Sequence, residues 1–276
     1  MQNYNLHTHS NFSDGKSEME EMVLDAISKN LKVIGITDHS PMPFENRVSL
    51  KKERINDYVA EVKRLKDKYK SQINVRIGME MEYIPGMSED FQSVRENLGL
   101  EYLIGSVHLV EKDGALWFID GAKIEPYDEG LNEIFHGDIK AGVKRFFEQS
   151  NMMIENEKFE IIGHFDKIKM NNKGRYFQES DKWYRDLLFE TLDLIKQKNL
   201  IVEVNTRGMY KGRYDGFYPS EWLFPFLKKM RIPVIISSDG HLAGEVSGCF
   251  EQADAALSGA GIEIVRLDDL DGIIGW

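Results

Sequence analysis

The sequence YNLHTHSNFSDG, at residues 4–15, joins a short apolar strand to two histidines and, five residues later, to Asp14 and a glycine. Because strand side chains repeat every second residue, His7 and His9 project to the same side of the chain. Two such imidazoles can bind one metal ion, but an isolated His-x-His pair is more often two surface or core histidines. The segment therefore predicts a metal site only if other strands end in the same way.

The composition narrows the class of protein. The 276 residues carry a net charge of -11, so the average field repels nucleic acid and acidic membranes. No stretch approaches the run of about 20 apolar residues that a spanning helix needs. The single cysteine, Cys249, excludes an intramolecular disulfide and a cysteine-cluster zinc site, and we expect it to be a small buried residue. We expect one cytoplasmic domain over residues 1–276 that binds neither nucleic acid nor membrane; the sequence leaves the oligomeric state open.

Short β-branched runs alternate with stretches of helical spacing along the whole chain. The predicted strands cover residues 4–6, 33–37, 73–77, 100–105, 159–163, 200–204 and 232–236. The predicted helices cover residues 17–30, 51–70, 88–98, 138–156, 178–198, 220–230 and 243–257. Residues 262–267 are a further candidate edge strand. Residues 111–137 show no regular pattern and are predicted to form an irregular loop or lid.

This alternation predicts parallel βαβ units, and the nearly continuous apolar strands fit a sheet covered on both faces. Nearly every predicted strand ends in His, Asp, Glu or Asn. An open doubly wound sheet concentrates its ligands at one switch point, whereas the strand ends of a closed barrel converge on one mouth. The distribution of polar residues therefore favours an α/β barrel.

Six of the seven histidines follow predicted strands, and only His136, expected to be exposed, does not. Histidine with carboxylate is the ligand set of Zn, Mn or Fe(II). The candidate metal ligands are His7, His9, Asp14, His39, Glu80, His108, His164, Asp239 and His241. Nine ligands exceed the needs of two ions and argue for three, with Glu80 as a bridging carboxylate. We expect Asp38 and Glu82 to orient imidazoles.

These motifs carry a resemblance that extends over nearly the whole chain. The ordered set comprises His7-x-His9, Thr37-Asp38-His39, Gly78-x-Glu80, Gly105-Ser106-Val107-His108, Gly163-His164-Phe165-Asp166 and Ser238-Asp239-Gly240-His241. It resembles the polymerase and histidinol phosphatase (PHP) family. Within that family the chain is most similar to the monofunctional histidinol-phosphate phosphatases, by its length, by Val202-Glu203-Val204-Asn205-Thr206 with Gly208, and by Tyr218-Pro219-Ser220.

The resemblance implies a distorted (β/α)7 TIM-like barrel with a trinuclear metal centre. It also implies hydrolysis of L-histidinol phosphate to L-histidinol and inorganic phosphate, a step of histidine biosynthesis. Two positions depart from the pattern. Several relatives have histidine where this chain has Asp14, and some have arginine where it has Lys169.

The expected mechanism uses a metal-bridging hydroxide that attacks phosphorus in line, while the third ion and a cationic side chain hold the phosphoryl oxygens. Arg207 is the first candidate for that side chain because its fork matches phosphate geometry, and Lys169 and Arg213 follow. Asp239 or a metal-bound water is expected to protonate the leaving alkoxide. Glu82, Asp120 and Trp117 are the candidates for binding the amine and imidazole of the substrate.

Two other functions remain open at this point. The first is a PHP phosphoesterase acting on nucleotides, nucleic-acid ends or another small phosphate ester. The acidic surface and the lack of interleaved aromatic and basic residues weigh against long polynucleotides. The second is a metal-binding domain without catalysis, against which the complete ligand set argues.

Overall fold

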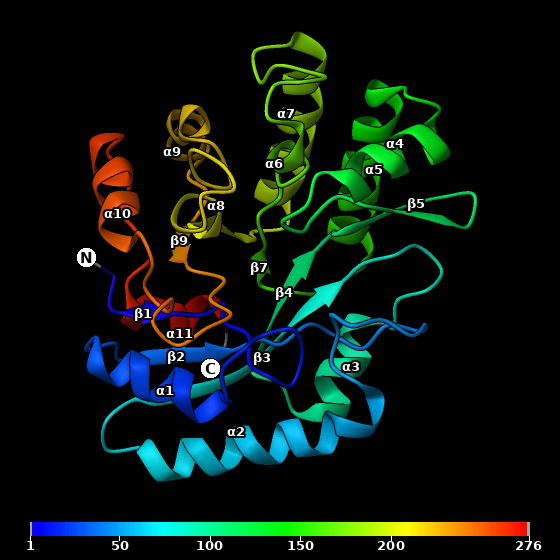
Figure 1. The fold of residues 1–276 in the computed structure, drawn as a ribbon. Helices are drawn as coiled ribbons and strands as arrows, with labels where there is room; N and C mark the ends of the chain where they lie inside the picture. The colour runs from blue at the N-terminus through cyan, green and yellow to red at the C-terminus, as the bar shows by residue number, and fades with distance from the viewer. Residues whose placement is uncertain (1, 275–276) are drawn as a thin grey trace.

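The computed structural model describes residues 2–274, and within that range seven parallel strands form one sheet in the order β1-β2-β3-β4-β7-β8-β9 (Figure 1). Each strand therefore pairs with the next one along the chain that belongs to the sheet. The strands are β1 (Tyr4–Asn5), β2 (Val33–Ile36), β3 (Asn74–Glu82), β4 (Tyr102–Ser106), β7 (Ile161–Ile162), β8 (Ile201–Asn205) and β9 (Val234–Ser237).

The two edge strands of the sheet, β1 and β9, meet through a few contacts. Thr8 and Gly240 form an isolated parallel bridge just beyond the two strands. At the other end, the Gln2 side chain accepts a hydrogen bond from Ile236 N at 2.8 Å and donates one to Ile236 O at 2.5 Å. The sheet is therefore a nearly closed seven-stranded parallel barrel, as the sequence predicted.

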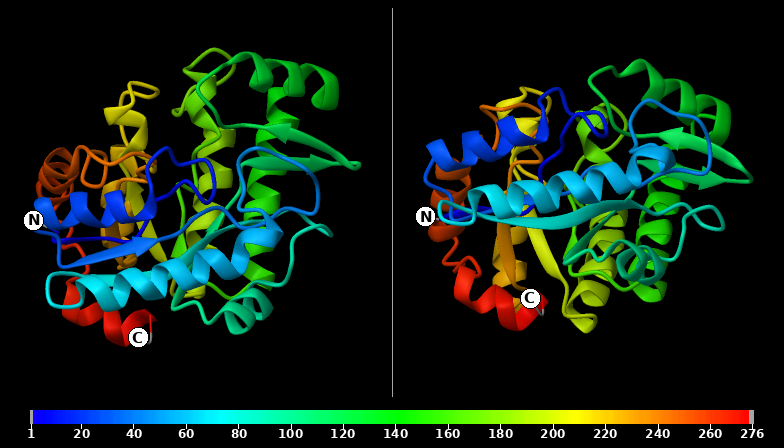
Figure 2. Two further views of the ribbon diagram at one scale, coloured as in Figure 1. Left: turned by 60° about the horizontal axis from the view of Figure 1, so that its bottom comes forward. Right: turned by 90° about the horizontal axis from the view of Figure 1, so that it is seen from below.

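Helices surround the barrel because each crossover between parallel strands returns along its outside (Figures 1 and 2). Their apolar stripes pack on the outer face of the strands, and those buried residues form one large core cluster. The longer helices are α1 (Met19–Ser28), α2 (Ile55–Tyr69), α3 (Phe91–Leu98), α4 (Glu125–Phe135), α5 (Ile139–Asn156), α7 (Lys182–Gln197), α9 (Phe224–Met230), α10 (Phe250–Gly259) and α11 (Leu267–Ile274). The short helices are α6 (Lys169–Asn172), α8 (Arg207–Tyr210), η1 (Lys52–Arg54) and η2 (Glu221–Leu223).

A second apolar cluster fills the inside of the barrel, away from the polar strand ends. Its buried members are Tyr4, Leu6, Val33, Tyr102, Ile104, Ile161, Ile201, Ile235, Leu270 and Ile274. The last two belong to α11, which covers the amino-terminal ends of the strands. A Cβ at Gly35 would lie 1.8 Å from Oη of Tyr102, so glycine is required where that ring crosses the interior. This interior is packed with buried apolar side chains, so the polar residues that could bind a ligand lie at the carboxyl ends of the strands.

Residues 111–137 differ from the predicted irregular loop. They include most of an antiparallel hairpin, β5 (Leu109–Lys112) and β6 (Ala115–Phe118), and all of α4. Trp117 anchors this unit because its side chain is fully buried and its Nε1 donates to Tyr127 O at 2.8 Å. The sequence pattern did not predict this hairpin, because its strands pack on α4 and α5 instead of joining the barrel sheet.

Three further predictions were wrong in detail. Residues 262–266 form no strand, although Val265 N donates to Val234 O at 2.9 Å. The helix predicted from residue 243 begins only at Phe250, because Cys249 before it has a left-handed backbone with φ 56°. Cys249 was also predicted to be buried, but its side chain is only partly buried. His136 is exposed, as expected. Among the described residues, no helix combines the length and apolar character needed to cross a membrane.

Candidate metal centre and active site

The carboxyl ends of the barrel strands bring all nine predicted metal ligands together. Their ligand atoms form overlapping groups in which every atom lies within 4.8 Å of the others. The groups are His9, Asp14, His39 and His241; His7, His164 and Asp239; His7, His9 and Glu80; and His39, Glu80 and His108. The residues come from strand ends far apart in sequence, so the closure of the barrel creates the site. That they bind metal remains a prediction.

Glu80, near the end of β3, lies at the centre of this site. Its Oε2 atom is 3.3 Å from His7 Nε2 and 3.0 Å from His39 Nδ1. Its Oε1 atom is 2.9 Å from His164 Nε2 and 3.6 Å from His108 Nε2. Each oxygen therefore faces a different set of imidazoles, which is the arrangement that a bridging carboxylate requires.

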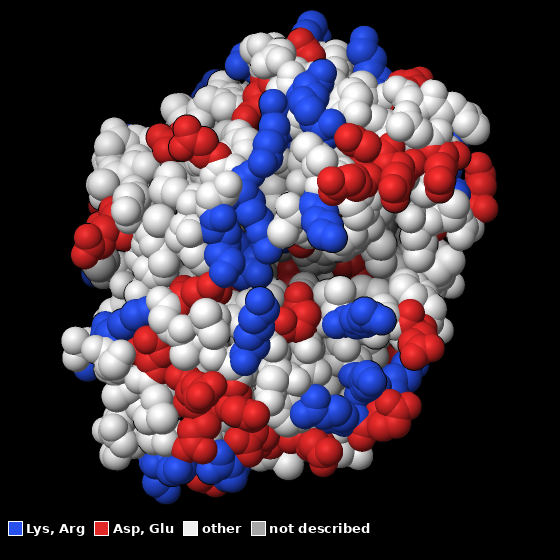
Figure 3. Space-filling view, viewed as in Figure 1, with Lys and Arg blue, Asp and Glu red and all other residues white. Residues whose placement is uncertain are grey.

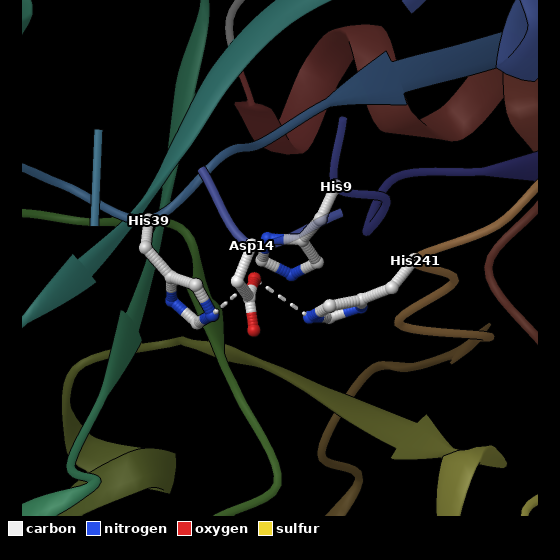
Figure 4. A group of neighbouring side chains, drawn as sticks. All are labelled: His9, Asp14, His39 and His241. Atoms are coloured by element: carbon white, nitrogen blue, oxygen red, sulfur yellow. Dashed lines mark ion pairs between the residues drawn. The ribbon is translucent and has the colours of Figure 1, made fainter. Parts of the chain in front are cut away.

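Asp14 reaches the same site from the loop after β1, beside three imidazoles (Figure 4). Its Oδ1 atom lies 3.1 Å from His241 Nε2 and 3.6 Å from His39 Nε2. The side chain is 32 % exposed, whereas the His9 ring beside it is fully buried. Although burial acts in the opposite direction, the neighbouring imidazoles lower the pKa of Asp14 well below its usual range. Asp14 is therefore an ionised carboxylate at the open side of the cluster.

Several buried ring and carboxylate atoms in the site have no hydrogen-bond partner among residues 2–274. They are His7 Nε2, His9 Nδ1, His9 Nε2, Asp14 Oδ1 and Glu80 Oε2. Buried polar atoms are normally satisfied, and metal ligation would explain why ring nitrogens and carboxylate oxygens that lie close together are left without partners.

The electrostatics of the cluster favour positive charge at the same point. Burial disfavours the charged imidazole of His7, yet Glu203 and Glu80 raise its pKa well above the usual value. Burial lowers the pKa of His39, but the nearby carboxylate of Glu80 outweighs this effect and raises that pKa to about 9. In contrast, burial and the charges of His241 and His39 lower the pKa of His9. Divalent ions can supply the positive charge that only some of these imidazoles can carry, so the residues fit a metal centre.

Two buried glutamates orient imidazoles from behind. Glu203 Oε2 accepts from His7 Nδ1 at 2.7 Å, and Glu203 Oε1 accepts from His164 N at 2.9 Å. Glu82 Oε2 accepts from His108 Nδ1 at 2.6 Å. The two ring contacts leave Nε2 of His7 and of His108 facing the candidate metal site. Glu203 was not among the predicted site residues; the available signal was a charged residue within the apolar run 201–204 of β8.

Two predicted roles change with this geometry. Glu82 was also predicted to bind substrate, but its carboxylate is buried against His108, and we reassign it to orienting that ring. Asp38 was predicted to orient imidazoles. Instead, its carboxylate accepts from Ser10 N at 2.9 Å and Ser13 N at 3.0 Å. Asp38 therefore fixes the loop that leads to Asp14.

Asp239, which follows β9, adopts a left-handed backbone conformation with φ 51°. This costs a non-glycine residue free energy and is typical of functional sites. Its Oδ1 lies 3.4 Å from His9 Nε2, and its Oδ2 accepts from Asn205 Nδ2 at 3.2 Å. Burial acts in the opposite direction, but Arg207 and other cations hold the pKa of Asp239 well below its usual range. An ionised Asp239 suits a metal ligand and does not suit the predicted general acid.

A cavity of about 350 Å³ opens beside the cluster. Asp14, His39, His108, Asp239 and His241 line one side of it, and apolar side chains line another. The apolar residues are Met42, Phe44, Val48, Leu109 and Phe118. Asp120 also faces the cavity, as predicted, whereas the fully buried Trp117 does not line it. The cavity is therefore lined by candidate metal ligands, by charged residues and by apolar residues, and its volume suits a small molecule.

Three cationic residues line this cavity. Arg207 Nη1 contacts His241 Nδ1 at 2.7 Å and lies 3.9 Å from Asp239 Oδ1. Arg213 is half-buried, with no ion pair among the described residues. Lys167, which the sequence analysis missed, is 3 % exposed and places Nζ 2.9 Å from Asp120 Oδ2. Figure 3 shows a band of Lys and Arg side chains over α6 and α8, beside a hollow in this face of an otherwise acidic molecule.

Lys169 does not line this cavity, contrary to its predicted role in substrate binding. It borders a different, wider cavity of about 630 Å³, and its side chain is 1 % exposed. The smaller cavity contains the converging ligands, so we place the chemistry there.

Comparison with known proteins identifies the family. The family model described as PHP domain matches residues 5–207. The chain belongs to the PHP family. Asp239 and His241 of this PHP protein lie beyond the matched range, and their place in the site comes from the structure.

Relatives of this PHP protein share most of its length. A histidinol-phosphatase of Bacillus subtilis is 26% identical over 269 residues, which cover 91% of this chain and 98% of that protein. A histidinol-phosphatase of Lactococcus lactis is 27% identical over 249 residues, which cover 88% of this chain and 86% of that protein.

Two solved structures share the fold, each at 22% sequence identity. One, from Listeria monocytogenes, has a TM-score of 0.79 and covers 90% of this chain and 99% of its own. The other is histidinol phosphate phosphatase from Lactococcus lactis, complexed with zinc, L-histidinol and phosphate. It has a TM-score of 0.66 and covers 96% of this chain and 95% of its own.

Proposed function

We propose that this PHP protein hydrolyses L-histidinol phosphate to L-histidinol and inorganic phosphate. The observation that carries the proposal is a buried carboxylate, Glu80, whose two oxygens face separate sets of imidazoles beside a cavity lined by three cationic residues. The names of the Bacillus and Lactococcus relatives, which align over most of both chains, support the choice of substrate.

The metal cofactors belong to the same proposal. We assign the nine ligands to three divalent ions of Zn, Mn or Fe, because the ligand atoms form overlapping groups that share Glu80 and several imidazoles. Such ions, when bound, supply a water molecule of lowered pKa and positive charge for the phosphoryl oxygens. The zinc in the Lactococcus complex supports this assignment. Glu203 and Glu82 hold His7 and His108 in the tautomers that ligation requires.

The phosphoryl group is proposed to lie against Lys167, Arg207 and Arg213. All three line the cavity, and Lys167 Nζ lies 3.8 Å from Asp239 Oδ2, close to the ligand cluster. Burial opposes its charge, but Asp120 and Asp239 raise the pKa of Lys167, so it remains an ammonium. An anion beside these residues replaces water and neutralises a charge that the protein already holds in place.

The histidinol part requires a group that accepts hydrogen bonds from its ammonium and a surface for its imidazole. Asp120 meets the first need, because it lines the cavity and Lys167 holds its pKa far below the usual range against the effect of burial. Phe44 and Phe118 provide apolar surface for a ring. This combination favours a small phosphate ester that carries an ammonium group over a nucleotide, whose base and ribose carry none.

The test is phosphate release from L-histidinol phosphate, compared with nucleotides and sugar phosphates at equal concentration. Chelator-treated protein is loaded separately with Zn, Mn or Fe(II), and E80Q protein is the matched control. We expect histidinol phosphate to exceed the other esters in kcat/KM by orders of magnitude and E80Q to lose turnover. Equal rates across the panel would refute the substrate assignment, and turnover by E80Q at the wild-type rate would refute the metal centre.

A further inference from the structure

Lys169 is a buried lysine that the proposed chemistry does not use. Its Nζ donates to Asp166 Oδ2 at 2.5 Å, to Phe217 O at 3.1 Å and to Ser220 Oγ. The three protons of an ammonium therefore each have an acceptor. Burial removes the hydration of an ammonium, and well-packed apolar residues often replace a buried ion pair without loss of stability. This arrangement thus indicates a requirement for fixed geometry.

A chain of hydrogen bonds leads from Lys169 through Ser220 to Glu179. Ser220 Oγ accepts from Lys169 and donates to Glu179 Oε2 at 2.6 Å. Glu179 also accepts from Trp222 Nε1 at 2.8 Å and from Tyr214 Oη. Glu179 thus accepts from donors in the segment 214–222, and Lys169 Nζ also lies 4.8 Å from the centroid of the Tyr214 ring.

This network joins two segments that approach the active-site cavity from different strands. Asp166 Oδ2 accepts from both Lys169 Nζ and Ser220 N, at 2.5 and 3.1 Å. The first segment, between β7 and α6, carries Lys167 into the cavity. The second segment, between α8 and η2, carries Arg213, the residue before the anchored Tyr214.

We infer that Lys169 is a positioning residue that fixes Lys167 and Arg213 relative to each other, so that both contact one phosphoryl group. The inference rests on the proposed function for its choice of anion. Long, flexible cationic side chains lose conformational entropy when they bind an anion. Anchoring the two backbone segments that carry Lys167 and Arg213 reduces the part of that loss that occurs on binding. Lys169 therefore affects the affinity for the anion. Loss of its side chain should leave the candidate metal ligands in place, because His164, the nearest of them in sequence, is held by its own contacts with Glu80 and Glu203.

The experiment compares Lys169→Met with Lys173→Met in metal-loaded protein. Lys173 is a matched control because it ends the same short helix, is exposed and has no ion pair among the described residues. We expect Lys169→Met to raise both the KM for histidinol phosphate and the Kd for inorganic phosphate, measured by calorimetry, by about tenfold. Its kcat should stay within about threefold and its metal content should not change. Lys173→Met should resemble wild type.

A smaller change covers the case in which Lys169→Met fails to fold. Ser220→Ala removes the link between Lys169 and Glu179 but retains the pair with Asp166. We expect it to weaken phosphate binding by about threefold. A purely structural role would lower the melting temperature and leave the phosphate Kd of the folded protein unchanged.

A phosphate Kd within twofold of wild type in every folded variant of the network would overturn the inference, as would an equal effect of Lys173→Met. Calorimetry with inorganic phosphate needs no turnover. If wild type binds phosphate in a manner that depends on Lys169 but does not hydrolyse histidinol phosphate, the substrate assignment fails and the positioning role stands.

Discussion

Replacing Glu80 with glutamine tests the metal centre most directly, because it removes one negative charge and hardly changes the side-chain volume. The carboxylate lies within 3.3 Å of three imidazole nitrogens, those of His7, His39 and His164. An ion held by these rings therefore lies a few Å from that charge. At an effective dielectric constant of about 20, two unit charges about 4 Å apart attract by about 4 kcal/mol. The lost charge should therefore weaken each neighbouring ion by about 10³-fold or more.

The assay measures metal content after dialysis against buffered Zn or Mn, together with phosphate release. We expect E80Q protein to lose at least two ions at concentrations that saturate wild type, and its turnover with them. Glu82→Gln is the matched control, because that carboxylate contacts the His108 ring alone among the predicted ligands, and a weakening of about 10–100-fold at one ion is expected. If E80Q retains all its ions with less than about tenfold loss of affinity, Glu80 is not a bridging ligand.

Three further predictions concern the support of the site and the barrel. Glu203→Gln should weaken metal binding by about 10–100-fold, measured by competition with a chelator, because the carboxylate that orients His7 is lost. Gly35→Ala should destabilise the fold by about 1–3 kcal/mol in urea denaturation, since the added methyl group meets the Tyr102 ring; unchanged stability would contradict the packing described. Burial opposes the ionisation of Glu101, yet two basic side chains and a backbone N–H lower its pKa. Its stabilising effect is therefore complete above the unfolded pKa of about 4.3 and is lost as pH falls through the lower folded value, so Glu101→Gln should flatten the acid limb of a stability–pH curve.

The family and the residues that meet at the barrel mouth were predictable from the sequence because they depend on local order. A short apolar run ending in His, Asp or Glu identifies a parallel strand and its functional end without knowledge of its neighbours. All nine predicted ligands converge because parallel strands in a barrel place their carboxyl ends at one mouth.

The lysines near α6 show where such reasoning fails. Lys167 and Lys169 are two residues apart, and nothing in their local sequence distinguishes them. The structure directs the first into the cavity, beside Asp120, and the second into the contacts around Asp166. The direction of each side chain depends on partners about fifty residues away in sequence, Asp120 for Lys167, and Phe217 and Ser220 for Lys169.

The sequence by itself determined the alternation of strands and helices, the seven-stranded barrel and the residue types at its mouth, since these follow from periodicity and strand polarity. Only the tertiary structure decided which carboxylates face a cluster of imidazoles and which orient a ring from behind, as with Glu80 and Glu203. It also decided that residues 109–118 form a hairpin around Trp117. The physical reason is that a buried charge or ring takes its role from the groups packed against it, and those groups come from distant parts of the chain.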